Sequence, residues 1–286
     1  MITYRDLTTL AEFAEVVDLE REIWGPGYDD VVPVSILTVS VHRGGILIGA
    51  FDSDRSIPRE PQGRMIGFVY SLPGIKGAKP THWSHMAGVV DGYRNAGVGY
   101  QLKLLQRERA LAMGLDLIEW TFDPMQAMNA HFNFAKLGVV VGEYQENAYG
   151  ESTSPLHKGN PTDRFVAEWW IREPHVARRL NAAPSQLPIA LRSREVAEAA
   201  RANRAQPAAE FAECVDVNLV IDEPRVLVEI PTGFTEMLSR APDLALAWRR
   251  ATRRIFTTYF ARGYRAVEFL LDRAGGKGAY LLARQA

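Results

Sequence analysis

The sequence predicts an α/β fold with a mixed (α+β) sheet. Apolar runs bounded by glycine, proline or aspartate recur along the chain, and such runs are typical of strands in a sheet. Stretches with apolar residues at helical spacing alternate with these runs, which indicates helices packed on the sheet. The chain has 286 residues, of which 47% are hydrophobic and 23% are charged, so it is able to fill a large core.

Composition narrows the classes of function. The formal net charge is −1, so no overall positive field favours nucleic acid as a partner. Cys214 is the only cysteine and no internal disulfide can form, which fits a reducing cytoplasm. The first residues lack the pattern of a secretory signal, and no uncharged run approaches the ~18 residues of a membrane span. We therefore expect a soluble cytoplasmic protein without a membrane partner.

The first 171 residues alternate between strand and helix patterns. Asp6 is the expected cap of the first helix, and Gly114 and Gly138 are expected to end later helices. Residues 150–162 are polar and rich in glycine, proline and serine, which indicates an exposed loop. The expected order is strand 2–4, helix 6–23, a helix from Pro33, antiparallel strands 45–53 and 65–74, strand 81–90, helix 98–113, strand 115–122, helix 124–138, and strands 139–150 and 163–171.

The pattern loosens beyond residue 171. We expect two domains, 1–171 and 172–286. Residues 173–188 and 193–210 have the composition of alanine-rich helices or linkers. Order returns with expected strands 217–221 and 225–231, helix 242–262, and strands 264–272 and 278–283.

A weak internal repeat links the two parts. The segments "MGLDLIEWTFD" and "RGYRAVEFLLD" share Gly114 with Gly263, Glu119 with Glu268 and Asp123 with Asp272, and each follows a long helix. One hypothesis is that the C-terminal region is a degenerate half-repeat of the first core, and the alternative is chance similarity between two helix-to-strand junctions. The second segment has no glycine motif before its helix, so no second cofactor site is expected there.

The glycine motif stands in "DGYRNAGVGYQLK", where Arg94, Gly97 and Gly99 form R-x-x-G-x-G before a helix. The first amides of a helix lack acceptors and lie at the positive end of its dipole. Glycines without Cβ atoms let a bulky anion approach these amides, although a plain tight turn is the alternative. The sequence has neither an early dinucleotide-binding glycine motif nor the Gly-Lys-Ser/Thr of nucleotide triphosphatases.

The motif and the order of elements around it resemble the GNAT superfamily of CoA-dependent N-acyltransferases, over roughly residues 1–171. The stretches "VVDGYRNAGVG" and "NAHFNFAKLG" carry the resemblance, which extends more loosely to a longer bacterial group of acetyltransferases with an added C-terminal region. It implies that the pyrophosphate of an acyl-CoA is bound by the motif and that the acyl-pantetheine arm enters a gap beside the strand before it. The implied cofactor-binding residues are Val89, Val90, Arg94, Asn95, Ala96, Gly97, Val98, Gly99 and Asn129.

The resemblance also implies a reaction. An acetyl or succinyl group would pass from CoA to a primary amine of a small molecule, with an amino acid or a related amine as the expected acceptor. His85, four residues before Val89, is the first candidate for the base that deprotonates the amine, because an imidazole with a pKa of ~6.5 suits neutral pH. Glu119 on the next strand is the second candidate. Their alternatives are an ordinary strand histidine and a surface charge.

One position departs from the family pattern. Phe134 stands where many members have the tyrosine that protonates the departing thiolate, so Tyr144 or Tyr149 would have to serve, or the thiolate would leave without an acid. A non-catalytic CoA-binding regulatory module and an acetyltransferase acting on proteins therefore remain alternatives. A homodimer is possible.

Other polar patterns are weaker. His82 and His85 would point to opposite faces of a strand, so we expect no metal site. A group of arginines on the helix 242–262 is expected to form a solvated basic face, and consists of Arg249, Arg250, Arg253 and Arg254. Trp169 and Trp170 are adjacent on a strand, so one of the two rings is expected to pack in the core.

Overall fold

The computed structural model describes residues 1–25, 27–28, 30–53, 63–150, 159–181, 196 and 199–284. The chain forms two compact units, Met1–Trp120 and Thr121–Ala286. The first unit ends within the range expected for the first domain, so residues 121–171 belong with the C-terminal region by their contacts. The domain boundary expected at 171 stays a prediction. Among the described residues, no helix is long and apolar enough to cross a membrane.

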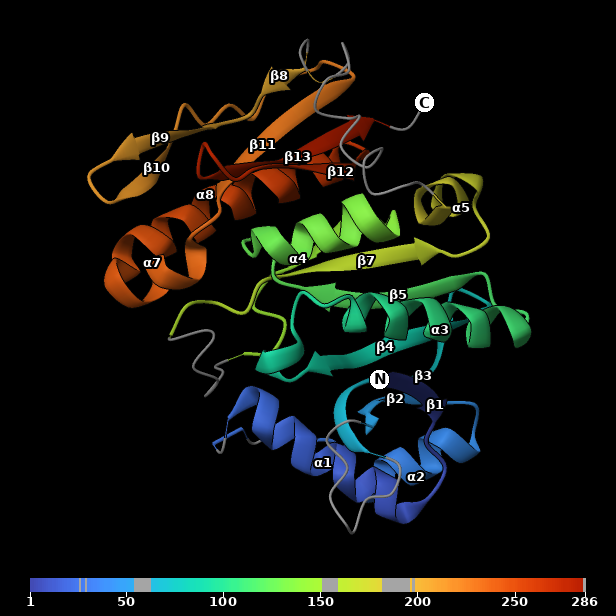
Figure 1. Cartoon of the computed structure of the whole chain (residues 1–286). Helices are drawn as coiled ribbons and strands as arrows, with labels where there is room; N and C mark the ends of the chain where they lie inside the picture. Colours follow the sequence, from blue (N-terminus) through green and yellow to red (C-terminus); the bar gives the residue numbers. More distant parts are fainter. Residues whose placement is uncertain are drawn as a thin grey trace. The chain divides into compact units, whose positions relative to one another are not determined.

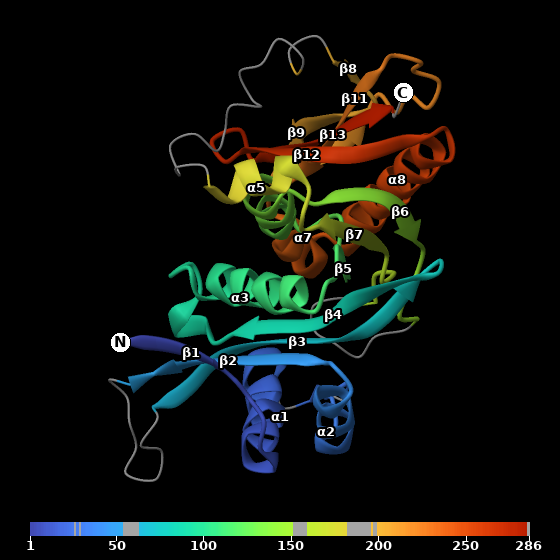
Figure 2. The ribbon, with the colours of Figure 1, turned by 90° about the vertical axis from the view of Figure 1, so that its right-hand side faces the viewer.

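The first unit is a sheet with helices on both faces (Figures 1 and 2). Helices α1 and α2 lie on one face and α3 lies on the other. The strands follow one another in the order β1-β2-β3-β4-β5. Its elements are β1 (Ile2–Asp6), α1 (Leu10–Trp24), α2 (Val34–His42), β2 (Ile46–Asp52), β3 (Arg64–Lys76), β4 (Lys79–Val89), α3 (Val98–Ala112) and β5 (Leu117–Phe122).

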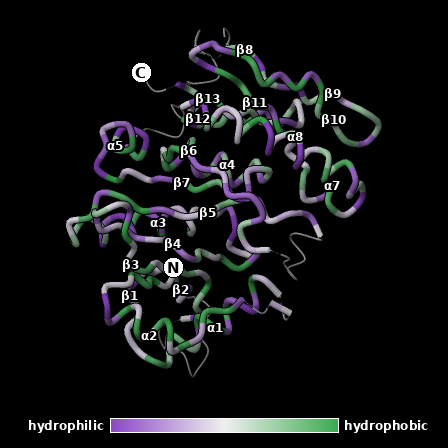
Figure 3. Tube along the Cα trace, turned by 180° about the vertical axis from the view of Figure 1, so that it is seen from behind, coloured by the Kyte–Doolittle hydropathy of each residue, from purple (hydrophilic) through white to green (hydrophobic). Residues whose placement is uncertain are grey.

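The mixed sheet confirms the predicted fold class. Strands β1 to β4 pair antiparallel with their neighbours, and β4 pairs parallel with β5 after the crossover through α3. Every residue of β2 is buried, and this strand lies in a hydrophobic stretch of the trace (Figure 3). A strand buried on both faces reads as a continuous apolar run, which is why its pattern did not alternate.

The start of α1 differs from the expected one. The cap is Thr9 rather than Asp6, and it forms a capping box with Glu12. The Thr9 hydroxyl accepts from the Glu12 amide while the Glu12 carboxylate accepts from the Thr9 amide, so two otherwise unpaired donors are satisfied. Asp6 lies in β1 instead and forms an ion pair with Arg109.

The second unit is also a sheet, in the order β7-β6-β12-β13-β11-β8, with a separate β9–β10 hairpin. Its core holds a cluster of aromatic rings, among them Phe165, Phe256 and Tyr280. Its elements are α4 (Ala127–His131), a π-helix (Phe132–Leu137), β6 (Val140–Gln145), β7 (Arg164–Trp170), α5 (Pro174–Asn181), β8 (Ala200–Arg201), β9 (Arg204–Ala208), β10 (Phe211–Val215), β11 (Arg225–Pro231), α7 (Phe234–Arg240), α8 (Pro242–Ala261), β12 (Tyr264–Asp272) and β13 (Lys277–Arg284).

Several expectations for the C-terminal region were wrong. Residues 217–221 form no strand, and β10 ends before them at Val215. Residues 200–208 hold the short strands β8 and β9 where helix or linker was expected, because tertiary pairing outweighs the helix propensity of alanine. The helix α7 was missed. Part of 173–188, part of 193–210 and most of the loop expected at 150–162 lie outside the described residues.

The topology of the second unit bears on the internal repeat. The pair β6 and β7 is antiparallel, as is the pair β12 and β13, and β6 meets β12 at Val141 and Ala266. Each pair follows a helical segment that ends at a left-handed glycine, Gly138 or Gly263. By topology, β12 therefore corresponds to β6, whereas the matched letters had aligned it with β5. The half-repeat stays a prediction.

Candidate active site

The helix α3 begins without a side-chain cap. Gly97 occupies the N-cap position in a left-handed conformation (φ 85°), and the first helical hydrogen bond runs from the Gln101 amide to its carbonyl. No side chain caps this end and its first turn holds no acidic residue. The amides of Val98 and Gly99 therefore have no acceptor within the helix, at the positive end of its dipole.

The loop before α3 keeps this end open. Asn95 also adopts a positive φ of 64°, and Arg94 donates to the Val89 carbonyl over 3.3 Å and pairs with Asp91 over 2.7 Å. A Cβ built on Gly97 would meet no atom within 4 Å. The glycine is thus needed for the backbone conformation, and the space next to it is open.

Strands β4 and β5 are paired at one end, the closed end, and separate toward the other, the mouth; we call this arrangement the fork. Their ladder consists of His82 with Ile118 and Trp83 with Glu119. No further pair follows, although β4 continues to Val89 and both strands lie wholly within the described residues. Gly99 lies beside Val89, because a Cβ on Gly99 would be 3.7 Å from the Val89 Cγ2. The mouth of the fork is therefore next to the open end of α3.

The fold is GNAT-like. This description rests on three features that the sequence led us to expect: the order strand–α3–strand, the separation of the two parallel strands, and the glycine-rich start of α3 without a cap. Strand β4 also has a β-bulge at His85, since Tyr70 pairs with Met86 and the next residue, Ser71, pairs with Ser84. A bulge bends a strand and redirects its side chains, and bulges are frequent beside active sites.

The chain is similar to several solved structures at low sequence identity. No family model and no curated protein matches the sequence. A GNAT-family acetyltransferase from Streptococcus pneumoniae is 16% identical, with 59% of this chain and 98% of that chain covered and a TM-score of 0.46. NAA60 of Arabidopsis thaliana in complex with acetyl-CoA is 13% identical (59% and 99% covered, TM-score 0.47). The ribosomal-protein-S18-alanine N-acetyltransferase of Escherichia coli is 12% identical (60% and 94% covered, TM-score 0.45).

His85 lies on the face of the GNAT-like sheet that α1 and α2 cover. Its side chain is exposed, and its ring packs edge-on against Tyr70 with 6.0 Å between centroids. Desolvation by the surrounding protein nevertheless lowers the pKa of His85. The ring is therefore neutral at pH 7 and able to accept a proton. His82 is buried instead, with its Nδ1 2.9 Å from the Ser71 hydroxyl.

Glu119 stands at the closed end of the fork. Its side chain is buried, and its Oε1 accepts from the Lys76 Nζ over 2.6 Å. The carboxylate is thus held in an ion pair with β3. The alternative, a plain surface charge, was wrong.

Aromatic side chains flank the same face. Trp24, the last residue of α1, stacks on Tyr28 with 5.5 Å between ring centroids and packs edge-on against Phe68. A Cβ on Gly88 would come within 3.0 Å of the Trp24 ring and 2.7 Å of Ile23. The glycine therefore lets the end of α1 sit directly on β4. We call the stacked pair of Trp24 and Tyr28 the aromatic wall. The sequence did not predict it, because only the fold brings Trp24 and Gly88 together.

Glu20 is a buried titratable group that the sequence analysis also missed. It is fully buried on α1, and its Oε2 accepts from the Val32 amide over 2.8 Å. Burial raises the pKa of Glu20 to about 7. A helical glutamate gives no sign in the sequence that it faces the core, apart from its place on the apolar side of α1 next to Val16, Val17 and Leu19.

The remaining predicted residues lie in the second unit. The Tyr144 hydroxyl donates to Asp163 over 2.6 Å, and burial with this neighbouring charge raises the pKa of Tyr144 well above its usual value. Phe134 is fully buried and packs against Phe122. The Tyr149 hydroxyl is 2.7 Å from that of Thr121. Asn129 is exposed and accepts from Asn133 over 3.3 Å.

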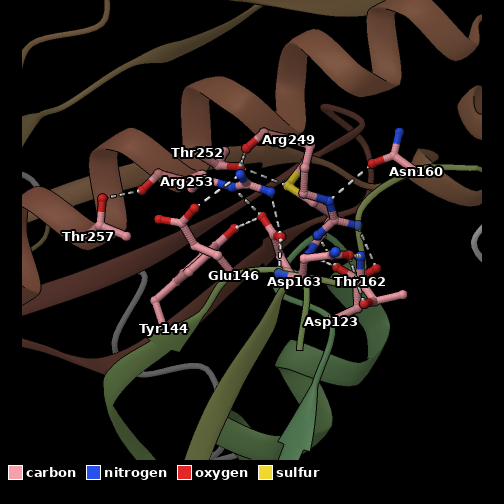
Figure 4. A network of polar contacts seen from close by, with 12 residues as sticks. Asp123, Tyr144, Glu146, Asn160, Thr162, Asp163, Arg249, Thr252, Arg253 and Thr257 are labelled. Atoms are coloured by element: carbon pink, nitrogen blue, oxygen red, sulfur yellow. Dashed lines mark hydrogen bonds and ion pairs between the residues drawn. The ribbon is translucent and has the colours of Figure 1, made fainter. Parts of the chain in front are cut away.

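The arginines of α8 do not form a solvated face. Arg249 is 1% exposed and makes a bidentate ion pair with Asp123, while Arg253 binds Asp163 with two nitrogens (Figure 4). Only Arg250 and Arg254 are exposed as expected. These two ion pairs could not be foreseen, because Asp123 and Asp163 lie in segments distant from α8 in the sequence. The expectation for the tryptophans is confirmed, since Trp169 is fully buried and Trp170 is not.

Proposed function

We propose that this protein is an acyl-CoA-dependent N-acyltransferase that transfers an acyl group to a primary amine of a small molecule. The observation that carries the proposal is the open, uncapped start of α3 beside the mouth of the β4–β5 fork. A diphosphate fits the first feature, because free amides, a helix dipole and the space above Gly97 suit an anion. An extended thioester arm fits the second.

In this proposal the chain holds the donor mainly through its backbone. The amides of Asn95, Gly97, Val98 and Gly99 bind the diphosphate, whereas those of Arg94 and Ala96 already donate to the carbonyls of Asp91 and Tyr93. The unpaired edge of β4 up to Val89 and Val90 binds the arm. The bound thioester supplies an activated acyl carbonyl. The assignment of Asn129 stays a prediction from the family resemblance.

His85 is the proposed base. It is exposed at the bulge of β4 and its lowered pKa keeps it neutral, so it can take a proton from the acceptor's ammonium group, directly or through water, and leave a neutral amine that attacks. Glu119 is the second choice because Lys76 already neutralises it. The wall of Trp24 and Tyr28 lies on the same face and suits an acceptor that carries an apolar or aromatic group.

The first experiment measures donor binding by calorimetry with acetyl-CoA, succinyl-CoA and free CoA. We expect Gly97→Ala to weaken binding of all three by about tenfold or more, because it adds a Cβ at the cradle and strains a left-handed residue. Gly92→Ala is the matched control, since a Cβ there meets no atom within 4 Å and its φ is ordinary. Equal binding by both variants would contradict the cradle.

The second experiment measures thiol release with a panel of small amines and peptides. We expect His85→Ala to lose about 10²-fold or more in kcat, in line with the usual contribution of a general base. His42→Ala, an exposed histidine at the end of α2, is the control. Turnover with peptides alone would favour a protein acetyltransferase.

A non-catalytic CoA-binding module is the second candidate. The observation that favours it is the buried, hydroxyl-free ring of Phe134 at the position where the family resemblance leads us to expect an acid. Tight CoA binding without thiol release for any amine or peptide would support this candidate.

A further inference from the structure

Lys103 on α3 is a buried amine. The side chain is 5% exposed. Its Nζ donates to the Ser84 hydroxyl over 2.8 Å and to Gln106 Oε1 over 3.0 Å, and lies 3.8 Å from the centre of the Trp120 ring. Ser84 also accepts from the Gln106 amide over 3.0 Å, so the polar cluster closes on itself.

These partners satisfy hydrogen bonds but carry no negative charge. Among the described residues, Lys103 takes part in no ion pair, and burial alone lowers the pKa of this amine to about 7. A buried lysine without a carboxylate is unusual, because the desolvation of its charge is not repaid by attraction. A negatively charged group placed beside Lys103 would therefore be attracted to its ammonium form.

The cluster marks the point where β4 and β5 separate. Ser84 directly follows Trp83 and Trp120 directly follows Glu119, and these are the last paired residues of the two strands. Lys103 thus bridges the fork from the face that α3 covers. Along β4, Ser84 is five residues from Val89 at the mouth, which corresponds to about 16 Å of strand. An arm anchored at the start of α3 and extended along β4 ends near this cluster.

We propose that the Lys103 amine, in its protonated form, stabilises negative charge at the end of the donor's arm, on the thioester and then on the departing thiolate. The inference rests on the proposed function. In the step concerned, the amine nitrogen bonds to the acyl carbon, the carbon–sulfur bond breaks, and sulfur leaves with the electron pair. The proton of the amine passes to the base, and the thiolate stays beside the ammonium until it is protonated.

Lys103 is the one member of this polar cluster that carries a charge near neutral pH. Ser84 and Trp120 on the strands and Gln106 on α3 do not titrate near neutral pH. His82, which precedes Ser84 by two residues, has a pKa lowered to about 4 by burial, so it is neutral. His85 contacts Tyr70 on the other face of the sheet.

The test follows the thiol of free CoA bound to the protein. CoA labelled with ¹³C at the carbon bonded to sulfur is titrated with pH by NMR in the wild type, Lys103→Met and Arg109→Met. Methionine preserves the volume of the chain without the charge, and Arg109 is a more exposed cation on the same helix. We expect the wild type and R109M to raise the acid dissociation constant of the bound thiol about tenfold over free CoA, and K103M to abolish the effect.

Two further measurements distinguish a failure of the proposed role of Lys103 from a failure of CoA binding. Calorimetry is expected to show that K103M binds CoA at pH 6 within about threefold of the wild type, and kinetics are expected to show a loss in kcat with little change in KM. Equal thiol titration in the wild type and K103M would overturn the inference while leaving donor binding intact. If the wild type binds no CoA, the proposed function itself fails.

Discussion

Arg249 and Asp123 form a bidentate ion pair in the interior of the second unit. Two guanidinium nitrogens lie 2.6 and 2.8 Å from the two carboxylate oxygens, and both side chains are almost fully buried (Figure 4). The attraction lowers the pKa of Asp123 and raises that of Arg249 despite their burial. The pair fastens α8 to the residue that follows β5.

We expect Arg249→Met to destabilise the protein by about 3–5 kcal/mol, because it leaves the Asp123 carboxylate buried without a counter-charge. Denaturant unfolding measures the loss. Arg250→Met is the control, since Arg250 is exposed and should cost less than about 0.5 kcal/mol. The double variant Asp123→Leu/Arg249→Met should recover part of the loss, and full additivity of the two single changes would contradict the pairing.

Lys103→Met should have the opposite effect on stability. Burial lowers the pKa of Lys103 from 10.5 to about 7, so between these values the unfolded chain binds a proton that the folded chain has released. Stability from this residue therefore rises with pH across that window, and below pH 7 the folded protein bears the full desolvation penalty. We expect K103M to melt higher than the wild type at pH 6, with the gap closing toward pH 10. A K103M that melts lower at pH 6 would contradict this.

Glu20→Gln tests a second buried titratable group of the first unit. Burial raises the pKa of Glu20 from 4.5 to about 7, so the stability that this carboxyl contributes is full below pH 4.5 and is lost as pH rises through 7. Glutamine keeps an acceptor for the Val32 amide. Thermal melts should show E20Q more stable than the wild type at pH 8 and nearly equal at pH 5. The exposed Glu108→Gln should show no such dependence.

Gly88→Ala tests the acceptor side of the proposed site. The added methyl group would overlap Ile23 and the Trp24 ring, so the end of α1 must shift. We expect the KM for the amine to rise about tenfold, while the calorimetric affinity for CoA stays within about twofold of the wild type. Gly92→Ala is again the control. A loss of CoA affinity with an unchanged KM for the amine would place the acceptor elsewhere.

The α/β class, the order of strands and helices in the first unit, and the glycine loop before α3 could be predicted from the sequence. These follow from local periodicity and from backbone positions that only glycine tolerates, so a single stretch of chain carries the information. The sequence did not predict the cap at Thr9, the short strands after residue 199, or which charges are buried, because those depend on partners distant in the chain.

The positions of the polar groups became known from the folded chain. It placed His85 on a bulge, neutralised Glu119 with Lys76, and buried Arg249 against Asp123. It also enclosed Lys103 at the fork, although the sequence shows only one more basic residue on an amphipathic helix. The physical reason is that burial and charge pairing depend on segments far apart in the sequence, which periodicity within one segment cannot report.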